Sequence, residues 1–123
     1  MIIGIGTDIV EIERLAQSLE RVKAHCFTPA ETAYCDKFRD LAVHYAGRWA
    51  AKEAFAKALG TGFGGGCAWM DLEIINDEAG KPEMRLSGAA LQTFEKMGGK
   101  TIHLSISHEK NYAIAFVIIE GEK

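Results

Sequence analysis

Two carboxylates of this chain stand where an isolated charge would be costly. Asp8 follows an apolar opening run of isoleucines, and Glu53 lies within an alanine-rich stretch over residues 48–59. A charged group in such surroundings is unfavourable unless it is paired or bound to a cation. Lys57 follows Glu53 by one helical turn. Two hard oxygen ligands beside a cationic side chain predict a divalent metal that meets a phosphate group, and therefore phosphoryl-transfer chemistry.

Each of these side chains also has a structural interpretation. Glu53 and Lys57 stand at i,i+4, the spacing of an ordinary ion pair on a helix surface. Asp8 could cap the helix that follows it, because Asp is favoured at that position. Glu53 shares a helix face with the small residues Ala46 and Ala50, which let another element or a ligand come close. This face therefore favours a binding site over a surface ion pair.

Basic and titratable side chains elsewhere carry less information. His108 ends an alternating strand beside serine hydroxyls, so it is either a structural residue or a phosphate ligand or proton carrier. Arg14, Arg21 and Lys23 lie on the first amphipathic helix. Their sign opposes the formal net charge of -3, so this face is either solvated or a docking surface for an acidic partner.

Alternating and helical periodicities predict both strands and helices along the chain. We expect strands and helices in turn along a single domain over residues 1–123. Thr28, Pro29 and Glu31 form a capping box at a helix start, and Gly60 ends the long alanine-rich helix. The expected strands cover residues 2–8, 69–75, 81–86, 102–108 and 112–120, and the expected helices cover about 10–23, 29–38, 41–59 and 88–97.

The last strand is apolar on both faces. Tyr112, Ile114 and Phe116 point one way, while Ala115 and Val117 point the other. In a domain this small, one face covers the internal helices and the other needs a partner, which predicts self-association. The alternative is a central strand that the same chain covers on both sides.

Glycine-rich segments match no nucleotide-binding motif. The opening glycines lack the third glycine of the dinucleotide fingerprint, because Ile9 occupies that position. Residues 61–66 follow a helix and lack the Gly-Lys-Ser/Thr ending of a phosphate-binding loop. We expect this segment to be a loop at the rim of a substrate site.

Composition places the chain among ordinary globular proteins. It is 48% hydrophobic and 25% charged, and the acidic balance gives no support for nucleic-acid binding. Three cysteines without a CxxC pair predict free thiols in a reducing compartment, and the cysteine and histidine spacing does not fit zinc. Since no signal peptide or membrane span is apparent, we expect a cytoplasmic protein.

Three sequence blocks together resemble the holo-acyl-carrier-protein synthases, the short bacterial 4′-phosphopantetheinyl transferases. The blocks cover residues 4–11, 49–58 and 105–108, and the Gly-Lys-Pro turn at 80–82 matches as well. The resemblance extends over essentially the whole chain. It implies the α+β fold of that family, with an antiparallel sheet and packed helices, assembled as a homotrimer with active sites at the subunit interfaces.

The resemblance also implies the reaction. Phosphopantetheine would move from coenzyme A to a serine of apo acyl carrier protein in fatty acid biosynthesis, with release of adenosine 3′,5′-bisphosphate. Asp8 and Glu53 would bind Mg²⁺, Lys57 would neutralise the diphosphate, and Arg14 and Arg21 would dock the carrier. The coenzyme A site would contain Arg48, Lys52, Lys57, Gly60, Thr61, Gly62 and His108.

Two questions stay open at this level. The serine proton could leave to a metal-bound water, to Glu31 or to His108. The chain could also be a magnesium-dependent nucleotide diphosphatase that uses water as acceptor, or a silent coenzyme A-binding module. Intact Asp8, Glu53 and Lys57 argue against the silent module.

Overall fold

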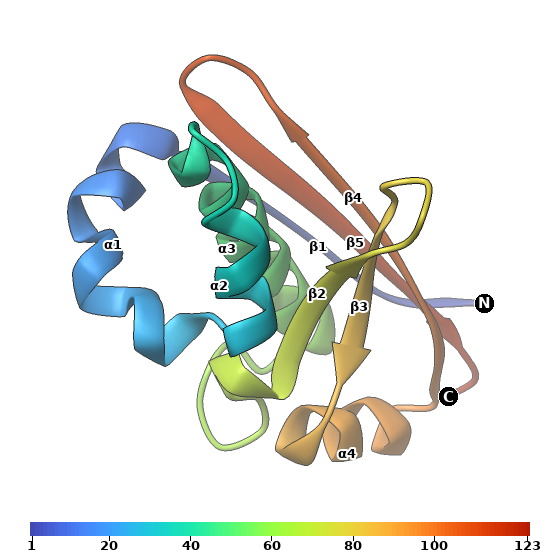
Figure 1. Ribbon diagram of the computed structural model, residues 1–123. Coiled ribbons are helices and arrows are strands. Elements are labelled where there is room, and N and C mark those ends of the chain that lie inside the picture. The colour runs from blue at the N-terminus through green and yellow to red at the C-terminus, as the bar shows by residue number, and fades with distance from the viewer.

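The computed structural model describes residues 1–123, in which helices cover one face of an antiparallel sheet (Figure 1). A second, two-stranded sheet lies beside α2, and this arrangement confirms the expected α+β class. The elements in chain order are β1 (Ile2–Glu11), α1 (Ile12–Cys26), α2 (Pro29–Cys35), α3 (Leu41–Leu59), a 3₁₀ turn (Trp69–Asp71), β2 (Leu72–Asn76), β3 (Pro82–Leu86), α4 (Gly88–Lys96), β4 (Gly99–His108) and β5 (Tyr112–Gly121).

The main sheet has the strand order β1-β5-β4, so the apolar last strand is central. One face of β5 is fully buried against α3, through Ala113, Ala115, Val117 and Ile119. The other face is open in the single chain: Ile114 is 43% exposed and Phe116 is 41% exposed. Ile5 and Ile9 of β1 extend this apolar surface, which we call the open sheet face. The expectation that only one face is covered within the chain is therefore confirmed.

Helix α3 runs between the sheet and helices α1 and α2 (Figure 1). Its alanines at positions 50, 51, 54, 56 and 58 are buried and form much of the larger hydrophobic cluster. Small side chains allow close helix–strand packing. The helix is apolar on most of its circumference because the sheet covers one side of it and α1 and α2 cover the other. As expected, it ends at Gly60, whose positive φ of 84° suits glycine at a helix C-terminus.

Helix α1 begins later than the sequence indicates. Strand β1 continues to Glu11, which pairs with Tyr112 of β5, and the helix starts at Ile12. The cap residue is Glu11, so the expectation that Asp8 caps this helix is wrong. Pairing with β5 extends β1 through residues 9–11, although the sequence pattern of these residues suits a helix as well as a strand. The inner face of α1 packs through Leu15 and Leu19 against α3.

The boundaries of two other elements also differ from expectation. The capping box of Thr28 and Glu31 at the start of α2 is confirmed, but this helix ends at Cys35 rather than near residue 38. Residues 69–71 form a 3₁₀ turn instead of the start of a strand. The Asp71 carboxylate stabilises that turn by accepting hydrogen bonds from the backbone N–H groups of Ala68 and Ala90.

All three cysteines are free and buried. Burial raises the pKa of the Cys35 and Cys67 thiols to about 11. No helix combines the length and the apolar character needed to cross a membrane.

Candidate active site

Strand β1 crosses α3 at very short range because two glycines of the strand face the helix. A Cβ atom at Gly6 would meet the carbonyl oxygen of Ala54 well inside 3.0 Å, a distance below which real Cβ atoms essentially never fall. Gly4 approaches the carbonyl one helical turn further along in the same way. Alternate residues of a strand point to the same side, so Asp8 also faces α3. The crossing therefore brings Asp8 to the helical turn that carries Glu53.

Lys57 forms an ion pair with one of the two carboxylates at this crossing. Its Nζ lies 3.0 Å from Oδ1 of Asp8 and also donates to the carbonyl oxygen of Thr7 at 3.0 Å. The Asp8 side chain is only 16% exposed, whereas that of Lys57 is 53% exposed. Lys57 therefore pairs with Asp8 and not with Glu53, the residue at i,i+4 spacing on the same helix.

The electrostatics of Glu53 reflect this crowding of charge. Burial raises the pKa of Glu53 above its ordinary value, and the nearby Asp8 carboxylate raises it further, while Lys57 lowers it. A cation between the two carboxylates would relieve both penalties. Asp8 and Glu53 are thus in one site, although they are far apart in sequence.

This carboxylate pair suits Mg²⁺ better than metals such as Zn²⁺ and Ca²⁺, which take more of their ligands from the protein. No group of three or more His, Cys, Asp or Glu side chains is arranged to hold an ion. Structural zinc needs four protein ligands and calcium six to eight oxygens, whereas Mg²⁺ is bound by one or two carboxylates and completed by water and substrate phosphates. Two converging carboxylates satisfy the last description.

A second basic group surrounds a pocket of about 150 Å³ between α3, β4 and the small sheet. Arg48 is 4% exposed there, donates to Oδ1 of Asn76 at 2.6 Å, and has its guanidinium 4.3 Å from the ring centroid of Tyr34. Its Nε is buried without a hydrogen-bond partner. His108 lines the same pocket, as does His44, whose pKa is lowered mainly by burial despite its neighbour Asp40. An orphaned guanidinium N–H among basic side chains suits an anionic group.

Within one chain, this pocket is separate from the carboxylate pair. Arg48 and Glu53 are five residues apart, which places them about 140° apart around α3. Arg48 and Lys57 are separated by about 13 Å along the helix axis. One chain therefore does not bring all the residues expected for the coenzyme A site into a single cavity.

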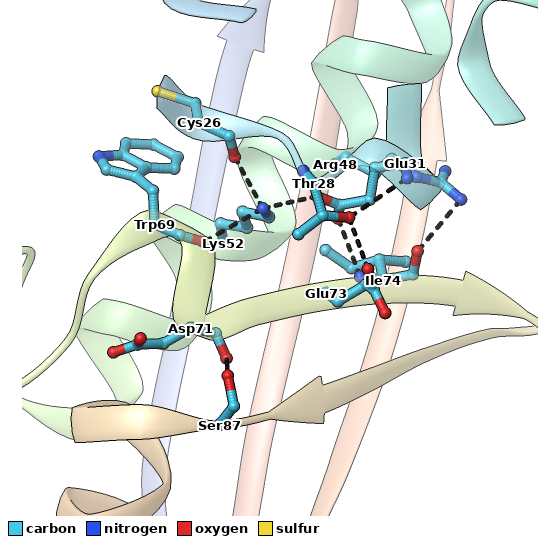
Figure 2. Close-up of polar contacts among 10 residues, drawn as sticks. All are labelled: Cys26, Thr28, Glu31, Arg48, Lys52, Trp69, Asp71, Glu73, Ile74 and Ser87. Carbon is cyan, nitrogen blue, oxygen red and sulfur yellow. Dashed lines mark hydrogen bonds and ion pairs between the residues drawn. The ribbon is translucent and has the colours of Figure 1, made fainter. Parts of the chain in front are cut away.

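Lys52 and Glu31 lie in neither group, but in a buried ion pair on another side of α3 (Figure 2). Lys52 Nζ lies 2.7 Å from Oε1 of Glu31, and both side chains are 0% exposed. Burial lowers the pKa of Lys52, and the Glu31 carboxylate opposes that shift. These positions correct two expectations: neither Lys52 as a coenzyme A ligand nor Glu31 as the base can reach a substrate, because both are enclosed and hydrogen-bonded.

The glycine segment, Gly60–Ala68, begins where α3 ends, three residues after Lys57. Gly60 and Gly62 both have positive φ, and the N–H of Gly62 bonds to the carbonyl oxygen of Ala56 at 3.2 Å. Thr61 is exposed and bonds only to the carbonyl oxygen of Gly62. The segment thus begins within one helical turn of Lys57 along the chain, at the C-terminal end of α3.

The two arginines expected to dock a carrier protein lie on α1, away from both groups. Arg14 and Arg21 are exposed and two turns apart on one face of this helix. The periodicity of α1 already predicts this shared face.

Two residues of the Arg48 pocket were not foreseen. Asn76 ends β2 and Tyr34 lies on α2, yet both hold the Arg48 side chain. No local pattern marks either residue, because the contacts join positions 14 and 28 residues away from Arg48.

Comparison with known proteins gives a consistent result. The sequence profile described as "4′-phosphopantetheinyl transferase superfamily" matches residues 4–117. Among curated proteins, the chain is similar to the holo-[acyl-carrier-protein] synthase of Koribacter versatilis, with 44% identity over 98% of this chain and 99% of that protein. The synthase of Geotalea daltonii shows 46% identity over the same shares.

The fold also matches a solved structure over nearly its full length. A holo-(acyl-carrier-protein) synthase from Bacillus anthracis, in complex with CoA (3′,5′-ADP), aligns with a TM-score of 0.86 and 37% identity. The alignment covers 99% of each chain.

Proposed function

The chain belongs to the 4′-phosphopantetheinyl transferase superfamily as a holo-[acyl-carrier-protein] synthase, and we propose that it transfers the 4′-phosphopantetheine of coenzyme A to a serine of apo acyl carrier protein. The second product would be adenosine 3′,5′-bisphosphate. The observation that carries this proposal is the meeting of Asp8, Glu53 and Lys57 at the crossing of β1 and α3. Its donor is supported by the coenzyme A complexes of similar synthases.

In this proposal Asp8 and Glu53 hold Mg²⁺. When bound, Mg²⁺ supplies electrostatic stabilisation to the negative charge of a diphosphate. Lys57 adds a second positive charge at the same place: its ammonium group is anchored by Asp8 and half exposed, so it can interact with a phosphate oxygen. Partial burial of Glu53 reduces the screening of these interactions by water.

Removal of the serine proton needs a base that reaches solvent. Glu31 is 1% exposed and accepts hydrogen bonds on both carboxylate oxygens, so we exclude it from this role. Among the side chains considered from the sequence, His108 remains, because it is exposed at the end of β4. A water molecule near the carboxylate pair is the other candidate.

We further infer that each coenzyme A site combines two copies of the chain. Arg48 and His108 line an anion pocket, and Arg48 lies about 140° around α3 from Glu53 and about 13 Å along the helix axis from Lys57. A site that uses both groups must therefore take them from different subunits. The open sheet face supports self-association, because a sheet with exposed Ile114 and Phe116 has an unburied apolar surface. A homotrimer is the assembly that the family resemblance implies.

The acceptor would dock on α1. Arg14 and Arg21 present two exposed guanidinium groups on one face of this helix, in a chain of net charge -3. Such a local basic face favours an acidic partner and accelerates its association. The cytoplasmic location and the role in fatty acid biosynthesis remain parts of this proposal.

The direct test incubates the protein with coenzyme A, Mg²⁺ and apo acyl carrier protein, and follows the mass of the carrier. We expect a phosphopantetheine increment that disappears when Mg²⁺ is chelated. Release of free phosphopantetheine with an unchanged carrier would instead support a diphosphatase.

A mixing experiment tests the shared site. Glu53→Gln and His108→Ala are each expected to be weak transferases, because each loses one of the two groups. Refolding an equimolar mixture should restore part of the activity, since some interfaces then combine an intact carboxylate pair with an intact His108. A mixture no more active than the average of the two variants would refute a site shared between subunits.

A further inference from the structure

We propose that Lys52 is a positioning residue that, together with Glu31, holds the Gly60–Ala68 segment against α3 and so sets the affinity for coenzyme A. The inference rests on the proposed function only in the identity of the ligand. Its structural part, that Lys52 seats this segment, stands on the contacts of the chain itself.

The ammonium group of Lys52 joins three separate parts of the fold (Figure 2). It donates to the carbonyl oxygen of Cys26 at the end of α1 at 2.7 Å, to Oε1 of Glu31 on α2 at 2.7 Å, and to the carbonyl oxygen of Trp69 at 3.2 Å. All three protons of the ammonium are thereby used. The third of these hydrogen bonds connects Lys52 to the 3₁₀ turn that follows the glycine segment.

Glu31 completes the pair from the other side. Its Oε1 also accepts from the N–H of Thr28 at 2.9 Å, and its Oε2 accepts from the N–H of Ile74 at 2.8 Å. Enclosing two opposite charges is no more stabilising than packing apolar side chains in the same volume. A buried pair with every hydrogen bond formed instead fixes the geometry of the elements that it joins.

The connection from Trp69 to the glycine segment is made by aromatic rings. The Trp69 ring stacks on Phe63 with centroids 3.9 Å apart and an angle of 8°, and its centroid is 4.4 Å from that of Trp49 on α3. The other attachments of this stretch are backbone hydrogen bonds, from Gly62 to Ala56 and between Gly64 and Cys67. Side-chain space is open there, because a Cβ at Gly62, Gly64 or Gly65 would meet no atom within 4 Å. The Phe63 ring is therefore the principal side-chain attachment of its first half.

The second half is attached independently. Thr93 of α4 donates to the carbonyl oxygen of Gly66 at 2.8 Å, and Cys67 is buried in the larger core cluster. Loss of the Lys52 contacts should therefore weaken the Phe63 attachment and loosen residues 60–65, while the backbone hydrogen bonds and Thr93 keep the segment folded. These residues begin one helical turn after Lys57, whose half-exposed ammonium group is proposed to meet a phosphate of the donor.

The test replaces the buried pair and compares it with a control at the same corner of the fold. Lys52→Met combined with Glu31→Gln removes both charges, so no unpaired ion is left inside. Asp36→Asn is the control, because it weakens the exposed Lys23–Asp36 ion pair between α1 and α2 without touching Trp69. Phe63→Ala removes the ring that links the segment to Trp69 and leaves the buried pair intact.

Two readouts separate positioning from a loss of stability. If the seated segment becomes a minor conformation, the apparent affinity falls in proportion to its population. We expect KM for coenzyme A to rise about tenfold in the double variant and in Phe63→Ala, with kcat within about threefold of wild type. The near-ultraviolet circular dichroism of the ligand-free protein should change as well, since Trp49 and Trp69 are its only two tryptophans. The control should alter neither quantity.

Each outcome decides the proposal. A folded double variant with wild-type KM and an unchanged tryptophan spectrum would refute it, as would Phe63→Ala with wild-type KM if the double variant fails to fold. A changed spectrum in a protein that shows no transfer even as wild type would leave the seating role standing and overturn the proposed function instead.

Discussion

The crossing of β1 and α3 makes Gly6 the most informative position to perturb. A Cβ atom there would lie inside 3.0 Å of the backbone of Ala54, and also 2.9 Å from the backbone nitrogen of Ala58. Backbone atoms cannot rotate away, so Gly6→Ala must push strand and helix apart by on the order of 1 Å. Such overpacking costs about 1–3 kcal/mol, which lowers Tm by roughly 4–12 °C in a chain of this size.

The same displacement acts directly on the proposed site. Asp8 lies two residues beyond Gly6 on the same strand face, so it moves away from Glu53 as the strand lifts. A misplacement of about 1 Å in a catalytic group can lower the rate about 100-fold. We therefore expect Gly6→Ala to lose far more activity than its modest loss of stability explains, at temperatures where the protein stays folded.

The assay combines thermal unfolding followed by circular dichroism with carrier-protein mass spectrometry at 25 °C. Gly65→Ala is the matched control, because a Cβ at that position meets no atom within 4 Å and its φ is not positive. Both variants are assayed at saturating coenzyme A, since Gly65 lies in the segment proposed to set the affinity for this substrate. Gly6→Ala with wild-type Tm and wild-type turnover would show that the close crossing does not exist in solution. Equal losses in both variants would show that glycine content, rather than the crossing, is responsible.

Three further predictions concern the charged group and the open sheet face. The pKa of Glu53 is higher in the folded protein than in the unfolded chain, so ionisation of this carboxyl group disfavours folding. The free energy of unfolding of the wild type should therefore decrease as the pH rises from about 4.3, the ordinary pKa of Glu, through the folded-state pKa. Glu53→Gln should therefore be the more stable protein at neutral pH without Mg²⁺, should lack this pH component, and should have almost no transferase activity; parallel stability–pH curves for the two proteins would contradict this. Lys57→Met should change the free energy of unfolding by less than about 1 kcal/mol, since its ion pair is half exposed, yet lower turnover about 100-fold or more, as urea titration and steady-state kinetics can measure. Phe116→Glu places a charge on the open sheet face and should give a folded monomer in sedimentation velocity; an unchanged assembly would exclude this face as the interface.

Local chemistry predicts much of this fold because several boundaries depend on neighbouring residues alone. The capping box of Thr28 and Glu31 and the positive φ of Gly60 are of this kind. The start of α1 is different: strand pairing between Glu11 and Tyr112 extends β1 over residues whose pattern also suits a helix. A contact 101 residues away decides that boundary, and no local rule contains it.

The site divides in the same way. Asp8 and Glu53 are conspicuous in sequence because each is a charge in apolar surroundings, and the structure brings them together. Lys52 belongs to the same motif as Glu53, so motif membership predicted a place in the active site for both, Glu53 as a metal ligand and Lys52 as a coenzyme A ligand. Their directions differ because consecutive helical residues point about 100° apart. Lys52 therefore faces the interior, where it pairs with Glu31. The sequence predicts Glu31 as part of a capping box and as a possible base, but it does not predict this pairing.

The burial of the three cysteines has a consequence for a protein whose proposed donor, coenzyme A, carries a thiol. Disulfide exchange requires an accessible thiolate, and Cys26, Cys35 and Cys67 offer neither exposure nor ready ionisation. Oxidised coenzyme A, in which the pantetheine sulfur is half of a disulfide, would find no partner on this chain. The protein can thus work beside a pool of reactive sulfur without being covalently trapped by it.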